Sequence, residues 1–112
     1  MKRTAIARKT PLRPRSAKRA AYMASDERAE GVRHMLAVKA LPCIACGAPP
    51  PSEAHHVTGD RMPRNDLRVI PLCPACHRGP RGYHLAKRSW VARHGRDCDL
   101  LPLVAQMLEK KV

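Results

Sequence analysis

The sequence predicts a small α+β domain that is held together by a bound metal ion. Two short stretches with strand character lie between two Cys-x-x-Cys pairs, and segments with helical spacing flank them. The chain has 112 residues, with one Trp, two Tyr and no Phe, so large side chains for a core are scarce. A chain this short buries little of its surface, and a structural metal supplies the missing stability. We therefore expect a zinc-stapled domain over residues 25–112.

Residues 1–24 are predicted to form a disordered basic arm. The first 20 residues hold eight Lys or Arg, two Pro and no acidic residue, and they sustain neither a helical nor a strand period. The whole chain carries 22 Lys or Arg against 9 acidic residues, a formal net charge of +13. This charge predicts a phosphate polyanion as the partner. Nucleic acid is favoured over a membrane, because no amphipathic membrane helix or lipid-anchor motif is present.

The first helix is predicted to begin after Ser25. The Ser25 side chain can cap the free amides of the first turn, and Asp26 and Glu27 complement the positive end of the helix dipole. The helix is expected to end before Pro42, because the residue ahead of a proline disfavours helical geometry. Its expected buried stripe consists of Val32, Met35, Leu36 and Lys39.

The segment between the cysteine pairs is predicted to form a β-hairpin. It is too rich in Pro and Gly for long helices, and its two short apolar stretches, around residues 54–57 and 67–72, have strand character. Residues 59–65 are expected to form the turn between them.

Two further helices are predicted after the hairpin. The segment HLAKRSWVARHG places Leu85, Ser89 and Trp90 near one face and brings Gly95 to a C-cap position. A last helix is expected at about residues 99–110, where apolar residues recur at helical spacing. Pro102 is tolerated there because it falls in the first turn.

Four cysteines carry the strongest metal-binding signal. The pairs Cys43-x-x-Cys46 and Cys73-x-x-Cys76 can each aim two sulfurs from a tight turn, and a hairpin between them would close a tetrahedral zinc site. Four thiolates leave no open coordination position, so this zinc is expected to be structural. No bilayer-crossing run or secretory signal is present, which predicts a cytoplasmic, reducing location where cysteines bind metal and do not form disulfides. Cys98 stands alone and is expected to flank a helix.

A second group of polar residues surrounds the predicted hairpin: His55, His56, Asp66, His77 and His84. Imidazole suits both divalent metal binding and proton transfer near neutral pH, so this group predicts a working site. Adjacent residues on a regular strand point to opposite faces, which would separate His55 from His56. Both can serve one site only where the strand ends or bulges, and the Thr-Gly that follows indicates a strand end.

Residues 43–84 resemble the zinc-containing branch of the H-N-H (ββα-metal) endonucleases. The resemblance is carried by the first Cys-x-x-Cys, Ala-His-His-Val, the run Asp-Leu-Arg-Val-Ile-Pro-Leu-Cys-Pro-Ala-Cys-His and a further His. The basic arm, the stretch RHMLAVKALPCIACG and the later helix pair are also similar to small phage proteins of the Ref type, which are described as RecA-dependent nucleases.

The resemblance implies a ββα-metal fold with its core at about residues 43–94. It implies that His56 is the general base that activates water, and that Asp66 or the neighbouring Asn65 orients it. The implied ligands of a catalytic Mg²⁺ or another divalent metal are His55, His77 and His84. His84 follows His77 by seven residues, farther than the one helical turn that would bring two ligands together.

The activity implied by the resemblance is metal-dependent hydrolysis of DNA phosphodiesters, in recombination or DNA processing. The implied partners are DNA and a RecA-type recombinase filament, and a phage origin would place the protein in the bacterial host cell. Because phosphate contacts carry little sequence information, we expect weak or no sequence preference.

Two other functions share features with the nuclease. A non-catalytic zinc-knuckle module that binds nucleic acid shares the four cysteines and the charge, but it leaves His55, His56 and His77 unexplained. A zinc nucleobase deaminase requires His-x-Glu ahead of its Pro-Cys-x-x-Cys, and this sequence has no such motif.

Overall fold

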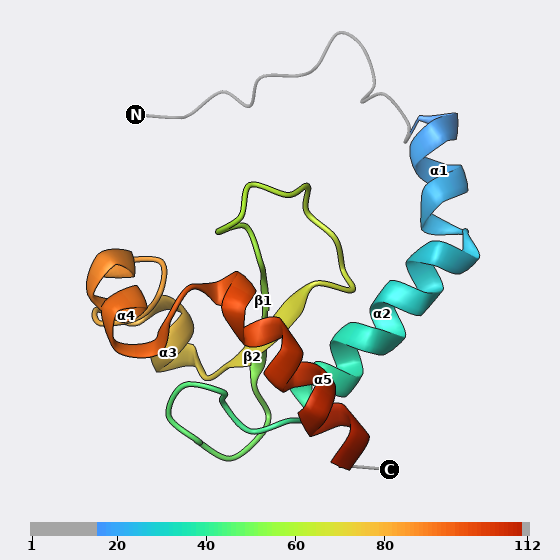
Figure 1. Ribbon diagram of the computed structural model, residues 1–112. Helices are drawn as coiled ribbons and strands as arrows, with labels where there is room; N and C mark the ends of the chain where they lie inside the picture. Colours follow the sequence, from blue (N-terminus) through green and yellow to red (C-terminus); the bar gives the residue numbers. More distant parts are fainter. Residues whose placement is uncertain (1–15, 111–112) are drawn as a thin grey trace, which may run out of the picture.

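A two-stranded antiparallel hairpin lies at the centre of the structure, and helices pack around it in an α+β arrangement (Figure 1). The structure is a computed structural model that describes residues 16–110. The elements in chain order are α1 (Ala17–Met23), α2 (Asp26–Lys39), β1 (Glu53–His56), β2 (Val69–Leu72), α3 (Pro74–Arg78), α4 (Lys87–His94), the 3-10 helix η1 (Asp97–Leu100) and α5 (Leu101–Lys110).

The two N-terminal helices begin at serine caps. The Ser25 side chain accepts a hydrogen bond from the Arg28 amide at 3.2 Å, so the predicted start of α2 is confirmed. The Ser16 side chain caps α1 in the same way. The predicted disorder of residues 1–24 is therefore wrong for residues 17–23, where a cap and an alanine-rich sequence favour a helix despite the positive charge. Residues 1–15 lie outside the part of the chain that the structure describes.

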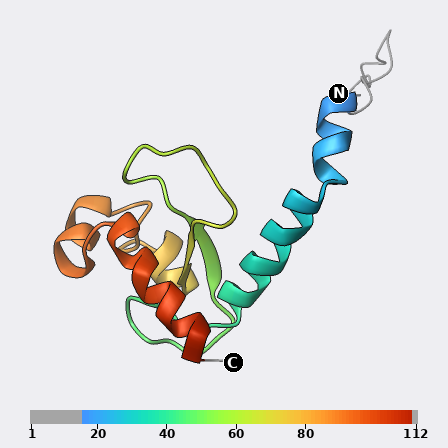
Figure 2. The ribbon, with the colours of Figure 1, turned by 45° about the vertical axis from the view of Figure 1, so that its right-hand side comes forward.

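Together α1 and α2 form an arm that extends away from the hairpin, and the C-terminal part of α2 packs next to the strands (Figures 1 and 2). The residues of α2 that are buried are Gly31 and Val38, not the predicted stripe, and Leu36 is 59% exposed. Helix α2 contacts the core over only part of its length, so few of its residues are buried. Helical spacing of apolar residues along the whole helix does not show which residues these are.

Both predicted strands are present, and they pair in a simple register. Glu53 lies opposite Leu72, and His55 lies opposite Ile70. All four residues of β2 are buried, because α2, α3 and α5 each contact this strand. Strand β1 therefore lies between the buried strand β2 and the surrounding helices.

The C-terminal helices close the core. Helix α4 ends at Gly95, as predicted, and its Trp90 is 1% exposed and packs edge to face on Tyr83 with ring centroids 5.2 Å apart. Leu85 precedes the helix and is 71% exposed, so its predicted place on one helical face with Ser89 and Trp90 is wrong. The predicted last helix is confirmed as η1 followed by α5. The buried apolar residues of the core are Val38, Leu41, Cys43, Val57, Val69, Ile70, Leu72, Tyr83, Trp90 and Val104.

Within residues 16–110, no helix is long and apolar enough to cross a membrane.

The packing of Trp90 gives a first testable prediction. Replacing Trp90 with Ala should lower the free energy of unfolding by about 3–5 kcal/mol, the usual cost of deleting a buried large aromatic side chain. Chemical denaturation followed by circular dichroism measures this change. Leu85→Ala is the matched control and should stay within about 0.5 kcal/mol of wild type, because that side chain is exposed. Equal effects of the two substitutions would contradict this packing.

Candidate metal centre and catalytic site

The four predicted cysteine ligands come together at the base of the hairpin. The Sγ atoms all lie within 4.8 Å of one another in this cluster, which consists of Cys43, Cys46, Cys73 and Cys76. Tetrahedral zinc with Zn–S bonds of about 2.3 Å places its sulfurs about 3.8 Å apart, so this donor set fits zinc. The predicted four-cysteine cluster is therefore confirmed, and it is compatible with a structural zinc ion.

Local backbone turns aim these sulfurs. In the first pair, the Gly47 amide donates to the Cys43 carbonyl and the Cys43 amide donates to Ala48, both at 2.9 Å. In the second pair, Cys73 is the N-cap residue of α3 and accepts from the His77 amide at 2.9 Å. The Ile44 amide also donates to the Pro71 carbonyl, which ties the first pair directly to β2.

The surroundings of Cys43 favour its thiolate, the form that binds metal. Burial raises the pKa of the Cys43 thiol, but backbone amides of Cys73, Cys46 and Ala45 donate to its sulfur and bring the pKa down to about 7. Burial and the neighbouring sulfurs instead raise the pKa of Cys76. Four sulfurs this close repel one another as thiolates, and a divalent cation offsets that repulsion.

The three predicted histidine ligands also meet. Ring nitrogens of His55, His77 and His84 all lie within 4.8 Å of one another, and the Nε2 atoms of His77 and His84 are 3.0 Å apart. His55 comes from β1, His77 from α3, and His84 from the segment before α4. His84 comes close to His77, seven residues earlier, because the chain turns back along α3. There the Tyr83 amide donates to the Cys76 carbonyl at 2.7 Å.

Two carboxylates that sequence reasoning did not identify hold these rings. Asp97 Oδ2 lies 2.9 Å from His55 Nε2, and Glu53 Oε1 lies 2.9 Å from His77 Nδ1. A carboxylate on one ring nitrogen of a metal-binding histidine fixes the tautomer and leaves the other nitrogen free for the metal. Glu53 could have been noticed, because it lies two residues before His55 on the same strand face.

Asp97 is fully buried and joins the C-terminal part of the chain to the end of β1. Besides His55, it accepts from the amides of Thr58 and Gly59 at 3.1 Å and of Cys98 at 2.8 Å. A side chain at Gly59 would collide with the Asp97 carboxylate, so only glycine permits this approach. Burial opposes ionisation of Asp97, yet the hydrogen bonds from His55 and Thr58 keep its pKa below the usual range.

The histidine cluster suits a transition metal better than Mg²⁺. Burial lowers the pKa of His55 and of His84, which keeps both rings neutral and able to bind a metal. Neutral imidazole is a ligand for zinc, copper, iron and nickel, whereas Mg²⁺ takes oxygen ligands and keeps several waters. Of the two predicted alternatives, Mg²⁺ or another divalent metal, the donor set therefore favours the second.

His56 lies outside this cluster and has its own partners. Its Nε2 is 2.9 Å from Asp66 Oδ1, and Arg28 donates to Asp66 Oδ2 at 2.9 Å. The hydrogen bond from His56, with that from Arg28, lowers the pKa of Asp66. Gly31 makes room for this arrangement, because a Cβ there would lie 2.8 Å from the Asp66 Cβ. Of the two predicted orienting residues, the structure places Asp66 on His56, whereas the Asn65 side chain accepts from the Leu67 amide.

The position of His55 and His56 on β1 bears out the expected strand end. β1 ends at His56, and the two side chains meet different partners because adjacent strand residues point to opposite faces. The structure thus brings together the three histidines on one side and the pair His56–Asp66 on the other.

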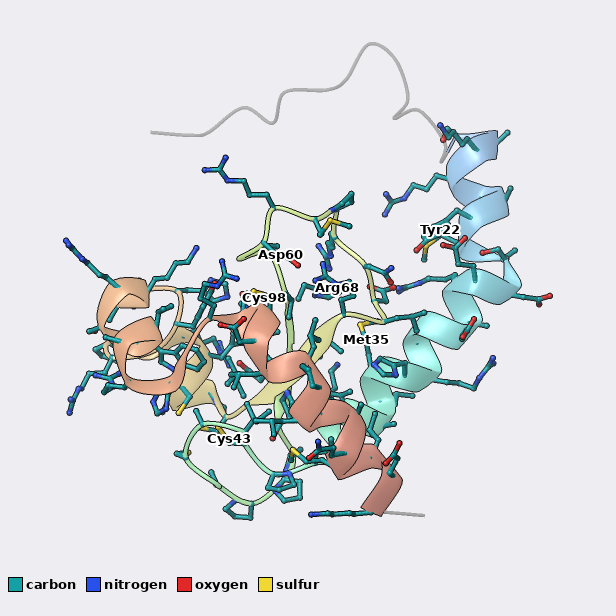
Figure 3. All side chains as sticks on the ribbon, in the orientation of Figure 1. Tyr22, Met35, Cys43, Asp60, Arg68 and Cys98 are labelled. Carbon is teal, nitrogen blue, oxygen red and sulfur yellow. The ribbon has the colours of Figure 1, made fainter. Side chains whose placement is uncertain are left out.

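The cysteine cluster predicts that zinc removal unfolds the domain. Chelation, or the substitution Cys46→Ser, should abolish the helical circular dichroism signal, because a core of this size is expected to need the metal. Cobalt substitution provides the direct measurement, since sulfur ligands give a charge-transfer absorption band. Cys98→Ser is the control, because Cys98 lies apart from Cys43 near the start of α5 (Figure 3). Folded, metal-free wild-type protein would contradict the prediction.

A third prediction concerns Asp97. Asp97→Asn should weaken metal binding at the histidine cluster about 10- to 100-fold, the usual effect of losing a carboxylate partner of a metal-binding histidine. It should also cost about 1.5–3 kcal/mol of stability, because hydrogen bonds to a buried charge are lost. Metal titration and denaturation measure the two effects. Asp99→Asn, at an exposed neighbouring position, should change neither quantity. An unchanged metal affinity in Asp97→Asn would show that Asp97 does not orient His55.

Comparison of the chain with protein-family models, with curated proteins and with solved structures found no match in any of the three.

Proposed function

We propose that this chain is a metal-dependent DNA endonuclease of the H-N-H (ββα-metal) type. The observation that carries the proposal is the meeting of His55 from the hairpin, His77 from the helix that follows it and His84 from the segment before α4. A hairpin followed by a helix, with candidate ligands on both, is the arrangement that the ββα name describes. A structural zinc site alone does not call for three further histidines with two carboxylate partners.

Charge supports nucleic acid as the substrate. A formal net charge of +13 attracts a phosphate polyanion, and exposed cations lie close in the sequence to His77 and His84. Among them, Arg81, Lys87 and Arg88 lie on the segments that follow α3. These side chains suit phosphate contacts, which position a strand without reading its sequence.

In the proposed reaction His56 is the general base. Its ring takes a proton from the attacking water, while Asp66 holds the ring in one orientation and Arg28 holds Asp66. A divalent metal bound by His55, His77 and His84 would stabilise negative charge on the phosphate and the leaving oxygen. Since His55 and His56 point to opposite sides of β1, the phosphodiester is expected to lie across the end of this strand, where it can reach both.

We also propose that a RecA-type filament is the partner that presents the DNA to this chain. The same assay that tests the nuclease tests this partner, if it is run with and without recombinase-coated DNA.

The test is cleavage of plasmid and single-stranded DNA in the presence of Zn²⁺, Mn²⁺ or Mg²⁺. His56→Ala should retain fold, structural zinc and DNA binding but lose about 10²–10⁴-fold in cleavage rate, the usual worth of positioned acid-base catalysis. His55→Ala and His77→Ala should lose metal binding as well as cleavage, and added metal should partly restore these two variants but not His56→Ala. His34→Ala, on α2, is the matched control and should cleave at the wild-type rate.

The result also separates the nuclease from the zinc-knuckle binding module. Metal-dependent cleavage that persists at the wild-type rate in His56→Ala would remove the proposed mechanism. DNA binding with no cleavage by the wild type under any of these conditions would favour the binding module.

A further inference from the structure

We propose that a cavity between the helical arm and the loop after β1 binds an unpaired nucleotide of the DNA strand. As a statement about substrate, this inference rests on the proposed nuclease function. As a statement about binding, it can be tested without cleavage.

The cavity has the size of a small-ligand site. It measures about 470 Å³, within the ~300–1,000 Å³ typical of such pockets, and it is open to solvent. One wall comes from α1 and α2, and the other comes from residues 64–67, which approach the strand β2. Figure 3 shows Tyr22 at the junction of α1 and α2, across from the loop that carries Asp60.

Exposed apolar side chains line both walls. Tyr22 is 45% exposed and Met23 37% exposed on the helical arm, and Leu67 is 43% exposed on the loop. Large apolar side chains that stay in water while facing one another indicate a surface kept open for a ligand. An aromatic ring in a cavity that apolar side chains also line suits the flat face of a nucleobase, which stacks on Tyr in single-strand binding proteins.

Two guanidinium groups are available for the phosphates on either side of such a base. Within residues 16–110, Arg19 and Arg64 form no ion pair, and each lies on a different wall of the cavity. Arg28 is already engaged by Asp66. Glu27 is the one other carboxylate on the cavity wall, so two free cations face one free anion and the site favours a phosphate.

The cavity is linked to the candidate general base through a shared partner, Asp66. Arg28 and Asp66 line it, and Asp66 is also the partner of His56. A nucleotide that stacks on Tyr22 would therefore bring its strand to the side of Asp66 and Arg28, next to the partner of His56. Bases inside a duplex are covered on both faces by their neighbours, so a base can enter this cavity only when it is unpaired.

Fluorescence anisotropy with one labelled oligonucleotide, used as a single strand and as a duplex, tests the inference. No divalent metal is added beyond the structural zinc, so that no DNA is cut. Tyr22→Ala should weaken single-strand binding about five-fold or more and leave duplex binding unchanged, because one stacked base is lost. Tyr22→Phe keeps the ring and should bind as wild type does. The double substitution of Arg19 and Arg64 by Gln should flatten the salt dependence of single-strand binding.

Arg88→Gln is the charge control, since Arg88 lies on α4 and not on this cavity; it should affect single strands and duplexes alike. Unchanged single-strand affinity in Tyr22→Ala, or an equal loss for both DNA forms, would overturn the inference even if the wild type cleaves DNA. Selective loss of single-strand binding in a protein that cuts no DNA would uphold the cavity and overturn the nuclease.

Discussion

Four sulfurs meet at the base of the hairpin and join segments that lie before and after its two strands. Cys43 and Cys46 precede β1, whereas Cys73 follows β2 directly and opens α3. Closing this cluster therefore sets the ends of the hairpin and the start of α3 at once. A core without Phe, with Trp90 as its largest member, has little else to hold these segments together. The position of the histidine site is thus a consequence of the cysteine site.

Two buried or half-buried carboxylates then hold two of the histidine rings in fixed orientations. Glu53 holds His77 across the hairpin and helix, and Asp97 holds His55 from the far end of the chain. Asp97 also receives three backbone amides, so η1 and α5 cannot leave the hairpin without stranding a buried charge. Stability of the C-terminal helix and order in the histidine cluster are in this way coupled through one side chain.

Features that depend on residues close together in the chain can be predicted from this sequence, whereas contacts between distant residues cannot. The Ser25 cap, the Gly95 helix end, the paired cysteines and the strands depend on residues close together in the chain, and the structure contains all of them. Asp97 meets His55 across 42 positions, and nothing near Asp97 in the sequence indicates that contact. Leu36 fits a helical stripe yet is exposed, because what covers a helix is set by tertiary packing.

Side chains alternate between the two faces of β1, so His55 and His56 point in opposite directions. Under the proposed function, this alternation gives the two histidines different roles. One histidine faces the ring cluster that can hold a metal, and the next faces Asp66 and the open cavity beyond it. A metal-binding ring has to be neutral, whereas a general base has to reach water and substrate. Under the proposed function, the two sides of one short strand meet these two requirements, and the DNA is proposed to lie across the end of β1 at His56.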